Sequence, residues 1–136
     1  MKRFLWLAAL ALVLLGAGCA KQAGPTPGIG DAPYKNISAQ EFKAVLETQK
    51  KDFLLVDVHI PEQKHIAGTD LVVPFNKIEQ NKSKFPADKS KKMVIYCRSG
   101  SMSIDAAQKL AGLGYTNIYN LEGGTYAWQA AGYPVE

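Results

Sequence analysis

Apolar residues of this chain gather in short runs, and segments with a helical period separate the runs. The runs span residues 53–58, 71–74, 93–96 and 117–121. Short continuous apolar runs are typical of strands that are buried on both faces of a parallel sheet. Helical segments are expected at 38–51, 76–84, 103–113 and 125–128. Strands that alternate with helices predict an α/β sandwich with a mainly parallel central sheet.

The first predicted helix has a recognisable beginning. Ser38 and Glu41 have the spacing of a capping box, and the apolar Ile37 precedes them as a hydrophobic staple does. We expect this helix to end near the lysine pair at 50–51, because positive charge suits a helix C-terminus.

The helix expected at 103–113 follows the third apolar run. Ile104, Ala107 and Ala111 fall on one face of it at helical spacing. Gly114 stands where a left-handed C-cap is usual, so the helix is expected to end there.

The N-terminal residues follow a different pattern. After a basic start, residues 4–18 form an uncharged apolar run of 15 residues. A membrane-spanning helix needs about 20 residues, whereas a shorter run behind basic residues is typical of a secretory signal. A buried core helix is the alternative, but such a helix usually carries some polar residues. The pattern therefore predicts an exported protein.

The end of this run resembles a bacterial lipoprotein cleavage box, because Cys19 follows the small residues 16–18. The resemblance implies cleavage before Cys19, lipidation of Cys19 and stable attachment to a membrane. The implied location is the bacterial cell envelope, on its periplasmic or extracytoplasmic face. Soluble secretion after ordinary cleavage is the alternative.

The domain organisation follows from these features. Residues 1–18 are predicted to be a signal peptide. Residues 19–36 contain several Gly and Pro and are predicted to be a flexible tether. Residues 37–136 are long enough for one folded domain.

The charge of the chain gives little support for a nucleic-acid partner. The formal net charge is +4, and it falls to about +2 when the signal peptide with its two basic residues is removed. Lysines gather at 82–92, but no aromatic platform is interleaved with them. We therefore interpret this segment as a solvated connector.

The candidate for chemistry is the loop that follows the third apolar run. It reads Cys97, Arg98, Ser99, Gly100, Ser101, Met102 and Ser103. Small residues let the backbone curl, so that several N–H groups point at one sulfur, and a helix N-terminus adds to their field. Both effects favour the thiolate. The alternative is a small buried residue that ends a strand.

The cysteine count favours a reactive thiol at Cys97 over a merely buried one. The chain has two cysteines, and lipidation of Cys19 would leave Cys97 as a lone thiol in an oxidising compartment. There is no C-x-x-C pair for a dithiol mechanism. His59 and His65 lack the further ligands that a zinc site needs. We therefore expect no metal and no cofactor.

Asp57 is a second candidate, because it interrupts the apolar run 53–58 near its end. In parallel sheets, sites lie beyond the carboxyl ends of the strands. Asp57 and Cys97 could therefore share one edge of the sheet, with Asp57 supporting the site. A helix cap or a turn-forming aspartate is the alternative.

Three ordered segments of the chain resemble signatures of one protein family. They are Leu54–Val58 followed by His65–Thr69, then Cys97–Ser101, and finally Leu121–Gly124 with Ala127–Trp128 and Ala131–Pro134. Together they resemble the single-domain rhodanese-like sulfurtransferases over roughly residues 37–135. The resemblance implies a three-layer sandwich whose mainly parallel sheet is flanked by helices.

The resemblance also implies a mechanism. The Cys97 thiolate would take sulfane sulfur from a donor of the thiosulfate or polysulfide type, hold it as a persulfide, and pass it to an acceptor thiol or to cyanide. Residues 98–103 would form the cradle that stabilises the charged persulfide. Arg98 would order the loop or attract anionic donors, and Asp57 and His65 would support the site. The partners implied are a small sulfur-donor anion and a thiol acceptor, and the protein is expected to be a monomer.

Two other functions are alternatives to sulfur transfer. One is a rhodanese-fold binding or redox-sensing module of the cell envelope, which presents Cys97 without turnover. The other is a phosphatase of the same fold, whose Cys-x5-Arg loop would require an arginine where this chain has Ser103. Ser103 at that position argues against a phosphatase.

The chain departs from the family pattern at three points. His59 stands where an arginine commonly follows Asp-Val, and the segment from Asp57 to His65 is shorter than usual. Met102 stands where many thiosulfate-using members have a basic residue or threonine. A thioether offers a sulfonate no charge and no donor, so we expect thiosulfate to be a poor substrate and Met102→Arg to improve its use.

Overall fold

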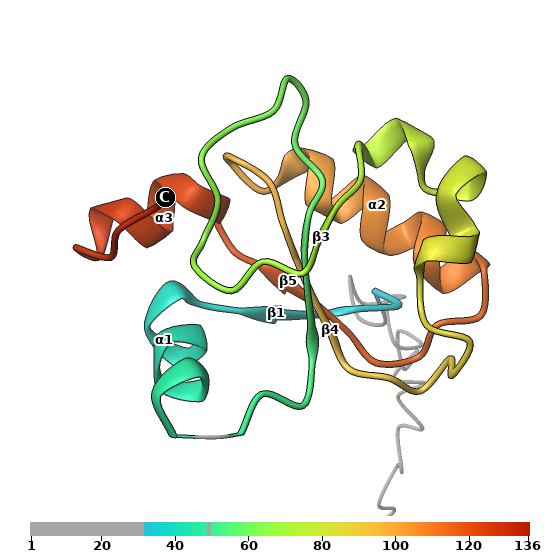
Figure 1. The fold of residues 1–136 in the computed structure, drawn as a ribbon, viewed down its shortest axis with the longest axis horizontal. Coiled ribbons are helices and arrows are strands. Elements are labelled where there is room, and N and C mark those ends of the chain that lie inside the picture. The colour runs from blue at the N-terminus through green and yellow to red at the C-terminus, as the bar shows by residue number, and fades with distance from the viewer. Residues whose placement is uncertain (1–31, 49) are drawn as a thin grey trace, which may run out of the picture.

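A parallel five-stranded sheet forms the centre of the molecule (Figure 1). The computed structural model describes residues 32–48 and 50–136. The predicted signal peptide, Cys19 and most of the predicted tether lie outside these residues. The strands have the order β1-β5-β4-β2-β3, and all four neighbouring pairs are parallel. Their bounds are β1 (Lys35–Ile37), β2 (Leu54–Asp57), β3 (Leu71–Val72), β4 (Met93–Tyr96) and β5 (Ile118–Leu121). The predicted parallel sheet is confirmed.

Helices cover both faces of the sheet (Figure 1). Two α-helices, α1 (Ala39–Thr48) and α3 (Gly124–Ala130), contact each other on one face. The other face is covered by α2 (Ser101–Gly112) and the 3-10 turns η1 (Phe75–Lys77) and η2 (Glu79–Lys84). Within the described part of the chain, no helix is both long and apolar enough to cross a membrane. The predicted three-layer α/β sandwich is confirmed.

Two hydrophobic cores result from the alternation of side chains along the central strands. Met93 and Ile95 of β4 pack into the core beneath α2. Val94 and Tyr96 pack into the core beneath α1 and α3, which also contains Phe42. Successive residues of a strand point to opposite faces, so a strand with a helix on each side needs apolar residues throughout. This explains the continuous apolar runs in the sequence.

The sheet begins earlier than expected. Lys35–Ile37 form β1 and pair in parallel with β5, whereas the sequence pattern places residues 35 and 36 in the tether. The segment is short and polar, and its strand conformation comes from pairing with β5 rather than from its own hydrophobic pattern.

The capping box that precedes α1 is present. The Oγ of Ser38 accepts a hydrogen bond from the N–H of Glu41, with a nitrogen–oxygen distance of 3.2 Å, and the Glu41 carboxylate accepts one from the Ser38 N–H at 2.9 Å. The Ser38 hydroxyl also donates to this carboxylate, and these bonds hold the pKa of Glu41 below its usual value.

α1 ends close to the predicted position, but its last turn carries no basic residue. The helix ends at Thr48, and Lys51 lies beyond it. The Lys51 ammonium instead donates to the carboxylate of Asp70 at 2.6 Å and to the carbonyl of Gly68. Lys51 therefore fastens the segment before β2 to the segment before β3.

The buried face of α2 also differs from the prediction. The helix begins at Ser101, and its buried residues are Ser103, Ala106, Ala107 and Leu110. Ile104 and Ala111, which were expected on that face, are only partly buried. The hydrophobic period alone could not choose between these overlapping faces, and packing of α2 on β4 and β5 decided it.

Candidate active site

Cys97 lies directly after β4, at the start of the loop that leads into α2. The residue is 1 % exposed and its thiol is free. The N–H of Gly100 donates a hydrogen bond to Sγ, with a nitrogen–sulfur distance of 3.0 Å. Gly100 has φ +104°, in the left-handed region that side chains rarely adopt. An N–H donor stabilises negative charge on sulfur, so this loop can hold Cys97 as a nucleophile.

The N-terminal end of α3 holds the cysteine loop from behind. The N–H of Thr125 donates to the carbonyl of Cys97 at 2.9 Å, and the N–H of Tyr126 donates to that of Arg98 at 3.0 Å. Gly124 lies so close to the loop that a Cβ built on it would be 2.2 Å from the Cys97 carbonyl oxygen. The Gly-Gly turn at 123–124 therefore lets two backbones approach within hydrogen-bond distance.

A chain of buried polar groups continues from the sulfur into the fold. The Oγ of Ser103 lies 3.5 Å from Sγ, 2.9 Å from the carbonyl of Gly100 and 2.6 Å from Oδ1 of Asn120. Asn120 in turn donates to Oδ1 of Asn36 on β1 at 3.0 Å. A hydroxyl has a single hydrogen, so Ser103 donates to one of its neighbours at a time and can accept from the thiol.

Asp57 and Cys97 lie at the same edge of the sheet, as expected, but on different faces. Asp57 ends β2 and pairs in register with Tyr96, the residue before Cys97. Cys97 belongs to the core beneath α2, whereas Tyr96 belongs to the core on the opposite face. Because register partners point to the same face, the carboxylate of Asp57 is directed away from the sulfur.

The buried Asp57 carboxylate organises the loop after β2. It accepts hydrogen bonds from the N–H of His59 at 2.9 Å and from Nε2 of Gln63 at 3.1 and 3.2 Å. Nδ1 of His65 lies 2.8 Å from it, and since a carboxylate only accepts, Nδ1 carries the hydrogen. His65 is thereby oriented by Asp57, and its backbone is paired in both directions with Glu136 at 2.8 Å.

Tyr96 supports the same loop from β4. Its hydroxyl accepts a hydrogen bond from the N–H of Ile66 at 3.0 Å and lies 2.7 Å from Oγ1 of Thr69. Burial raises the pKa of the Tyr96 phenol well above its ordinary value, so it stays neutral.

His59 and Arg98 bring the two loops into contact. Nε of Arg98 donates to Nε2 of His59 at 3.1 Å, and Nδ1 of His59 lies 2.7 Å from the carbonyl of Pro61. The Arg98 guanidinium also lies near the ring of Tyr126, 5.8 Å from its centroid. Arg98 is exposed, and so its guanidinium can meet a solute.

The remaining predicted cradle residues lie around this loop. Ser99 and Ser101 are exposed at the turn into α2. Met102 lies in the first turn of α2, where its half-buried side chain packs against the core beneath that helix. Met102 therefore has a packing role besides any contact with a donor.

Sequence reasoning missed three residues that complete the site: Gln63, Asn120 and Thr125. Thr125 donates to Oε1 of Gln63 at 3.2 Å, which links α3 to the loop after β2. Asn120 is a polar residue in an apolar run and Thr125 follows a Gly-Gly turn, so both carried a signal. Gln63 carried none, because its role depends on where the loop folds.

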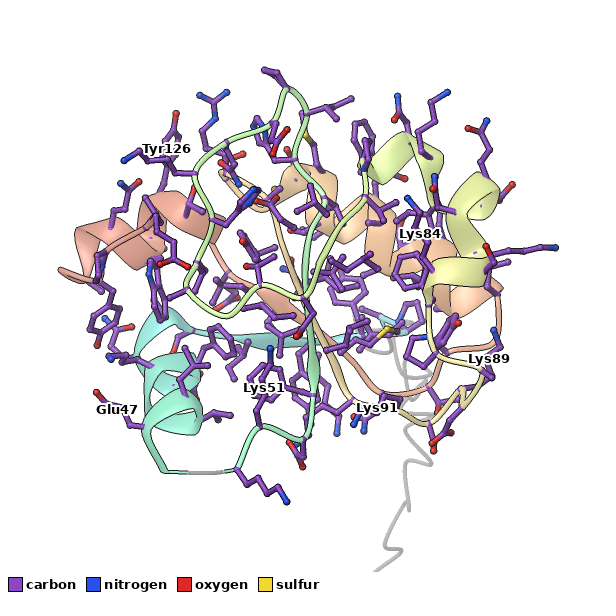
Figure 2. The ribbon with its side chains drawn as sticks, viewed as in Figure 1. Glu47, Lys51, Lys84, Lys89, Lys91 and Tyr126 are labelled. Carbon is purple, nitrogen blue, oxygen red and sulfur yellow. The ribbon has the colours of Figure 1, made fainter. Side chains whose placement is uncertain are left out.

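The opposite edge of the sheet has a different character. Lys89 and Lys91 lie there, far from Tyr126 (Figure 2). A cavity of about 380 Å³ at the amino ends of β1 and β5 is lined by Tyr34, Tyr115 and neighbouring residues. None of the predicted site residues lines that cavity.

The chain matches the rhodanese-like domain family over residues 38–131. It is 37 % identical over 87 residues to a sulfurtransferase of Allochromatium vinosum, covering 62 % of this chain and 79 % of that protein. It is 34 % identical over 100 residues to the thiosulfate sulfurtransferase GlpE of Coxiella burnetii, covering 71 % of this chain and 89 % of that protein. The crystal structure of a rhodanese-related protein from Thermoplasma volcanium is similar, with a TM-score of 0.64 and 26 % identity, covering 76 % of this chain and 98 % of that one.

Proposed function

Because this chain belongs to the rhodanese-like domain family, we propose that it is a sulfurtransferase or persulfide carrier. Cys97 takes sulfane sulfur from a donor of the thiosulfate or polysulfide type and passes it to an acceptor thiol or to cyanide. The relatives named as sulfurtransferases support this reaction class. The observation that carries the proposal is the hydrogen bond from the Gly100 N–H to the Cys97 sulfur, in a loop held by α3.

In the first half-reaction, the Cys97 thiolate attacks the sulfane sulfur of the donor. A bond forms between Sγ and this sulfur, while the S–S bond of the donor breaks. The leaving group departs with the bonding electron pair, as sulfite when the donor is thiosulfate. The first N–H groups of an α-helix have no partner within the helix, so those at the start of α2 support the charge of the resulting persulfide.

In the second half-reaction, the acceptor attacks the terminal sulfur of the persulfide. A new bond forms between the acceptor and that sulfur, and the Cys97 thiolate leaves with the electrons of the S–S bond. The enzyme returns to its starting state without an external oxidant or reductant. Two separate half-reactions of this kind give ping-pong kinetics.

Sulfur uptake tests this proposal directly. The full-length protein is incubated with thiosulfate or with a polysulfide, and its intact mass is measured. We expect a gain of one sulfur atom that is absent in Cys97→Ala and retained in the matched control Cys19→Ser. The gained sulfur should disappear when an acceptor thiol or cyanide is added.

The alternative is a rhodanese-fold module that presents Cys97 to a partner protein or senses redox state without turnover. Failure of every donor to add sulfur to folded protein would overturn the enzyme proposal in favour of this module.

We further propose that the protein is lipidated on Cys19 and held at the extracytoplasmic face of a bacterial membrane. The apolar run at 4–18 and the small residues before Cys19 support this proposal. Fractionation of cells that express the wild type or Cys19→Ser tests it. The wild type is expected in the membrane fraction, and a Cys19→Ser protein that stays there would overturn the lipidation.

A further inference from the structure

The direction of the Arg98 side chain is set by a residue from another loop. Arg98 is exposed and follows Cys97 directly, so it is the cation closest to the sulfur along the chain. Its Nε–H is engaged by Nε2 of His59, with a nitrogen–nitrogen distance of 3.1 Å. His59 is 5 % exposed and comes from the loop after β2.

The two contacts of the His59 ring select one tautomer. Nδ1 lies 2.7 Å from the carbonyl oxygen of Pro61, and a carbonyl only accepts, so Nδ1 carries a hydrogen. Nε2 accepts from Arg98, so Nε2 carries a lone pair. A neutral ring with its hydrogen on Nδ1 satisfies both contacts. A ring that is protonated on both nitrogens would place an N–H against the Nε–H of Arg98.

The surrounding structure holds this arrangement in place. The His59 N–H donates to the buried carboxylate of Asp57 at 2.9 Å, which fixes the backbone that carries the ring. On its other side Arg98 lies near the Tyr126 ring, 5.8 Å from the ring centroid. The N–H of Tyr126 also holds the Arg98 carbonyl at 3.0 Å. Figure 2 shows Tyr126 at the periphery of the molecule, and Arg98 is likewise exposed.

His59 leaves most of the guanidinium available. A guanidinium has five N–H donors, and His59 engages one of them. Arg98 makes no other side-chain hydrogen bond to the residues that the structure describes. Its two terminal amino groups therefore remain as a fork, and such a fork matches an oxyanion such as a sulfonate or carboxylate.

We propose that His59 is a positioning residue that turns Arg98 into an oxyanion receptor, and that the site consequently selects anionic over neutral reactants for Cys97. The proposal rests on the proposed sulfur transfer for its biological meaning, since the anion would be the sulfur donor. Its physical content is a positive field at the sulfur that depends on His59 as well as on Arg98.

Alkylation of Cys97 with a matched pair of reagents measures this field. The full-length Cys19→Ser protein, which has Cys97 as its one thiol, is treated with anionic iodoacetate and with neutral iodoacetamide. The measured ratio is the rate constant for iodoacetate divided by that for iodoacetamide. This ratio reports the charge that the reagent meets, because the reactivity of the thiol itself enters both rate constants and cancels. We expect Arg98→Gln to lower the ratio about fivefold, the effect of one unit charge at about 4 Å in water.

The His59 variants separate positioning from the mere presence of Arg98. His59→Phe keeps a flat ring but offers no acceptor, and we expect it to lower the ratio nearly as far as Arg98→Gln does. His59→Gln offers an amide oxygen to the Arg98 Nε–H and should restore most of the ratio. Lys84→Gln is the control, because it removes a positive charge that lies far from Tyr126 (Figure 2), and it should leave the ratio unchanged.

A spectroscopic measurement on protein without a His59 substitution keeps the test independent of whether the variants fold. The ¹⁵N shifts of the His59 ring at neutral pH should show hydrogen on Nδ1 and a lone pair on Nε2. A ring with its hydrogen on Nε2 would overturn the proposal, as would a folded His59→Phe protein with an unchanged rate ratio.

The outcome is distinguishable from failure of the proposed function. Alkylation requires only a thiol, so a His59-dependent ratio without any sulfur uptake overturns the transferase and leaves the oxyanion receptor standing. Sulfur uptake together with a ratio that does not depend on His59 overturns the oxyanion receptor and leaves the transferase standing. Where the transferase and the oxyanion receptor both hold, His59→Phe should raise the KM for thiosulfate about fivefold with little change in kcat.

Discussion

The loop after β4 is held through its backbone, whereas the loop after β2 is held through side chains. In the first, Gly100 donates its N–H to the sulfur, and α3 donates two N–H groups to the carbonyls of Cys97 and Arg98. In the second, the buried carboxylate of Asp57 collects donors from three residues of its own loop. The two loops share an edge of the sheet, yet they depend on different chemistry.

This difference determines which substitutions each loop tolerates. A backbone-held loop is sensitive to any Cβ that separates the two backbones, even one in a distant segment such as Gly124. A loop held by one carboxylate is sensitive to the charge and hydrogen-bonding capacity of that residue. His59 connects the two loops through Arg98, and Gln63 connects the loop after β2 to α3. Damage to the loop after β2 is therefore expected to reach the loop that carries Cys97.

The largest effect is expected where the loop after β4 is pushed away from the start of α3. Gly124→Ala places a Cβ 2.2 Å from the Cys97 carbonyl oxygen, at a φ of +54°. We expect it to lower the free energy of unfolding by about 3 kcal/mol, from overpacking together with left-handed strain. Urea denaturation measures this loss, and sulfur uptake measures the damage to the site.

Gly132→Ala is the matched control for that substitution. Gly132 also has a positive φ, +85°, but no atom lies within 4 Å of an added Cβ. It should therefore cost only the backbone strain, about 1 kcal/mol. Equal losses for the two variants would show that the close approach at Gly124 is unimportant.

The side-chain-held loop is broken by Asp57→Asn. The asparagine has a similar shape, but its amino group would face one of the N–H groups that now donate a hydrogen bond to the carboxylate. We expect the free energy of unfolding to fall by about 2–3 kcal/mol, because hydrogen bonds to a charged group are lost and a buried donor is left unpaired. Urea denaturation of Asp57→Asn beside the exposed Glu122→Gln checks this, and a similar small loss for both would contradict it.

Tyr96 supports the loop after β2 from β4 and gives the fold a pH dependence. Its pKa is raised by burial, so the neutral phenol is favoured in the folded state, while the unfolded chain releases the proton near pH 10. The contribution of Tyr96 is thus complete below pH 10 and is lost as the pH rises above it. Relative to Tyr96→Phe, the wild type should lose about 1.4 kcal/mol per pH unit in that range.

Denaturation curves of the wild type and Tyr96→Phe between pH 8 and pH 12 measure that dependence. The difference between the two proteins isolates Tyr96 from the other tyrosines and the lysines. Two curves that stay parallel across this range would show that the phenol ionises as easily in the folded chain as in the unfolded one.

Met102→Arg adds a charge to the loop that is held by its backbone. We expect kcat/KM for thiosulfate to rise about fivefold, as for one unit charge placed about 4 Å from an anion in water. Met102→Gln controls for the loss of the half-buried thioether from the core beneath α2. An unchanged kcat/KM in the arginine variant would count against our explanation of donor preference.

The smallest effect concerns the link between α3 and the loop after β2. Oγ1 of Thr125 donates to Oε1 of Gln63 at 3.2 Å. A double-mutant cycle with Thr125→Val and Gln63→Met should give a coupling free energy of about 0.5–1 kcal/mol. Additive losses of unfolding free energy would mean that α3 and the loop after β2 are held independently.

Much of the fold could be predicted from local patterns. The apolar runs predicted the parallel strands, and the spacing of Ser38 and Glu41 predicted the start of α1. These features depend on residues that are neighbours in the sequence, so their physics can be read without the tertiary structure. β1 and the buried face of α2 could not be predicted, because pairing with β5 and packing on β4 decided them.

The candidate site divides in the same way. Cys97, its small-residue loop and the Gly-Gly turn are contiguous signals, and the sequence by itself determined that a cysteine would lie where a strand enters a helix. Only the tertiary structure decided that Asp57 faces away from the sulfur, because that depends on strand register. It also decided the contact of His59 with Arg98, since loops of different strands meet only in the folded chain.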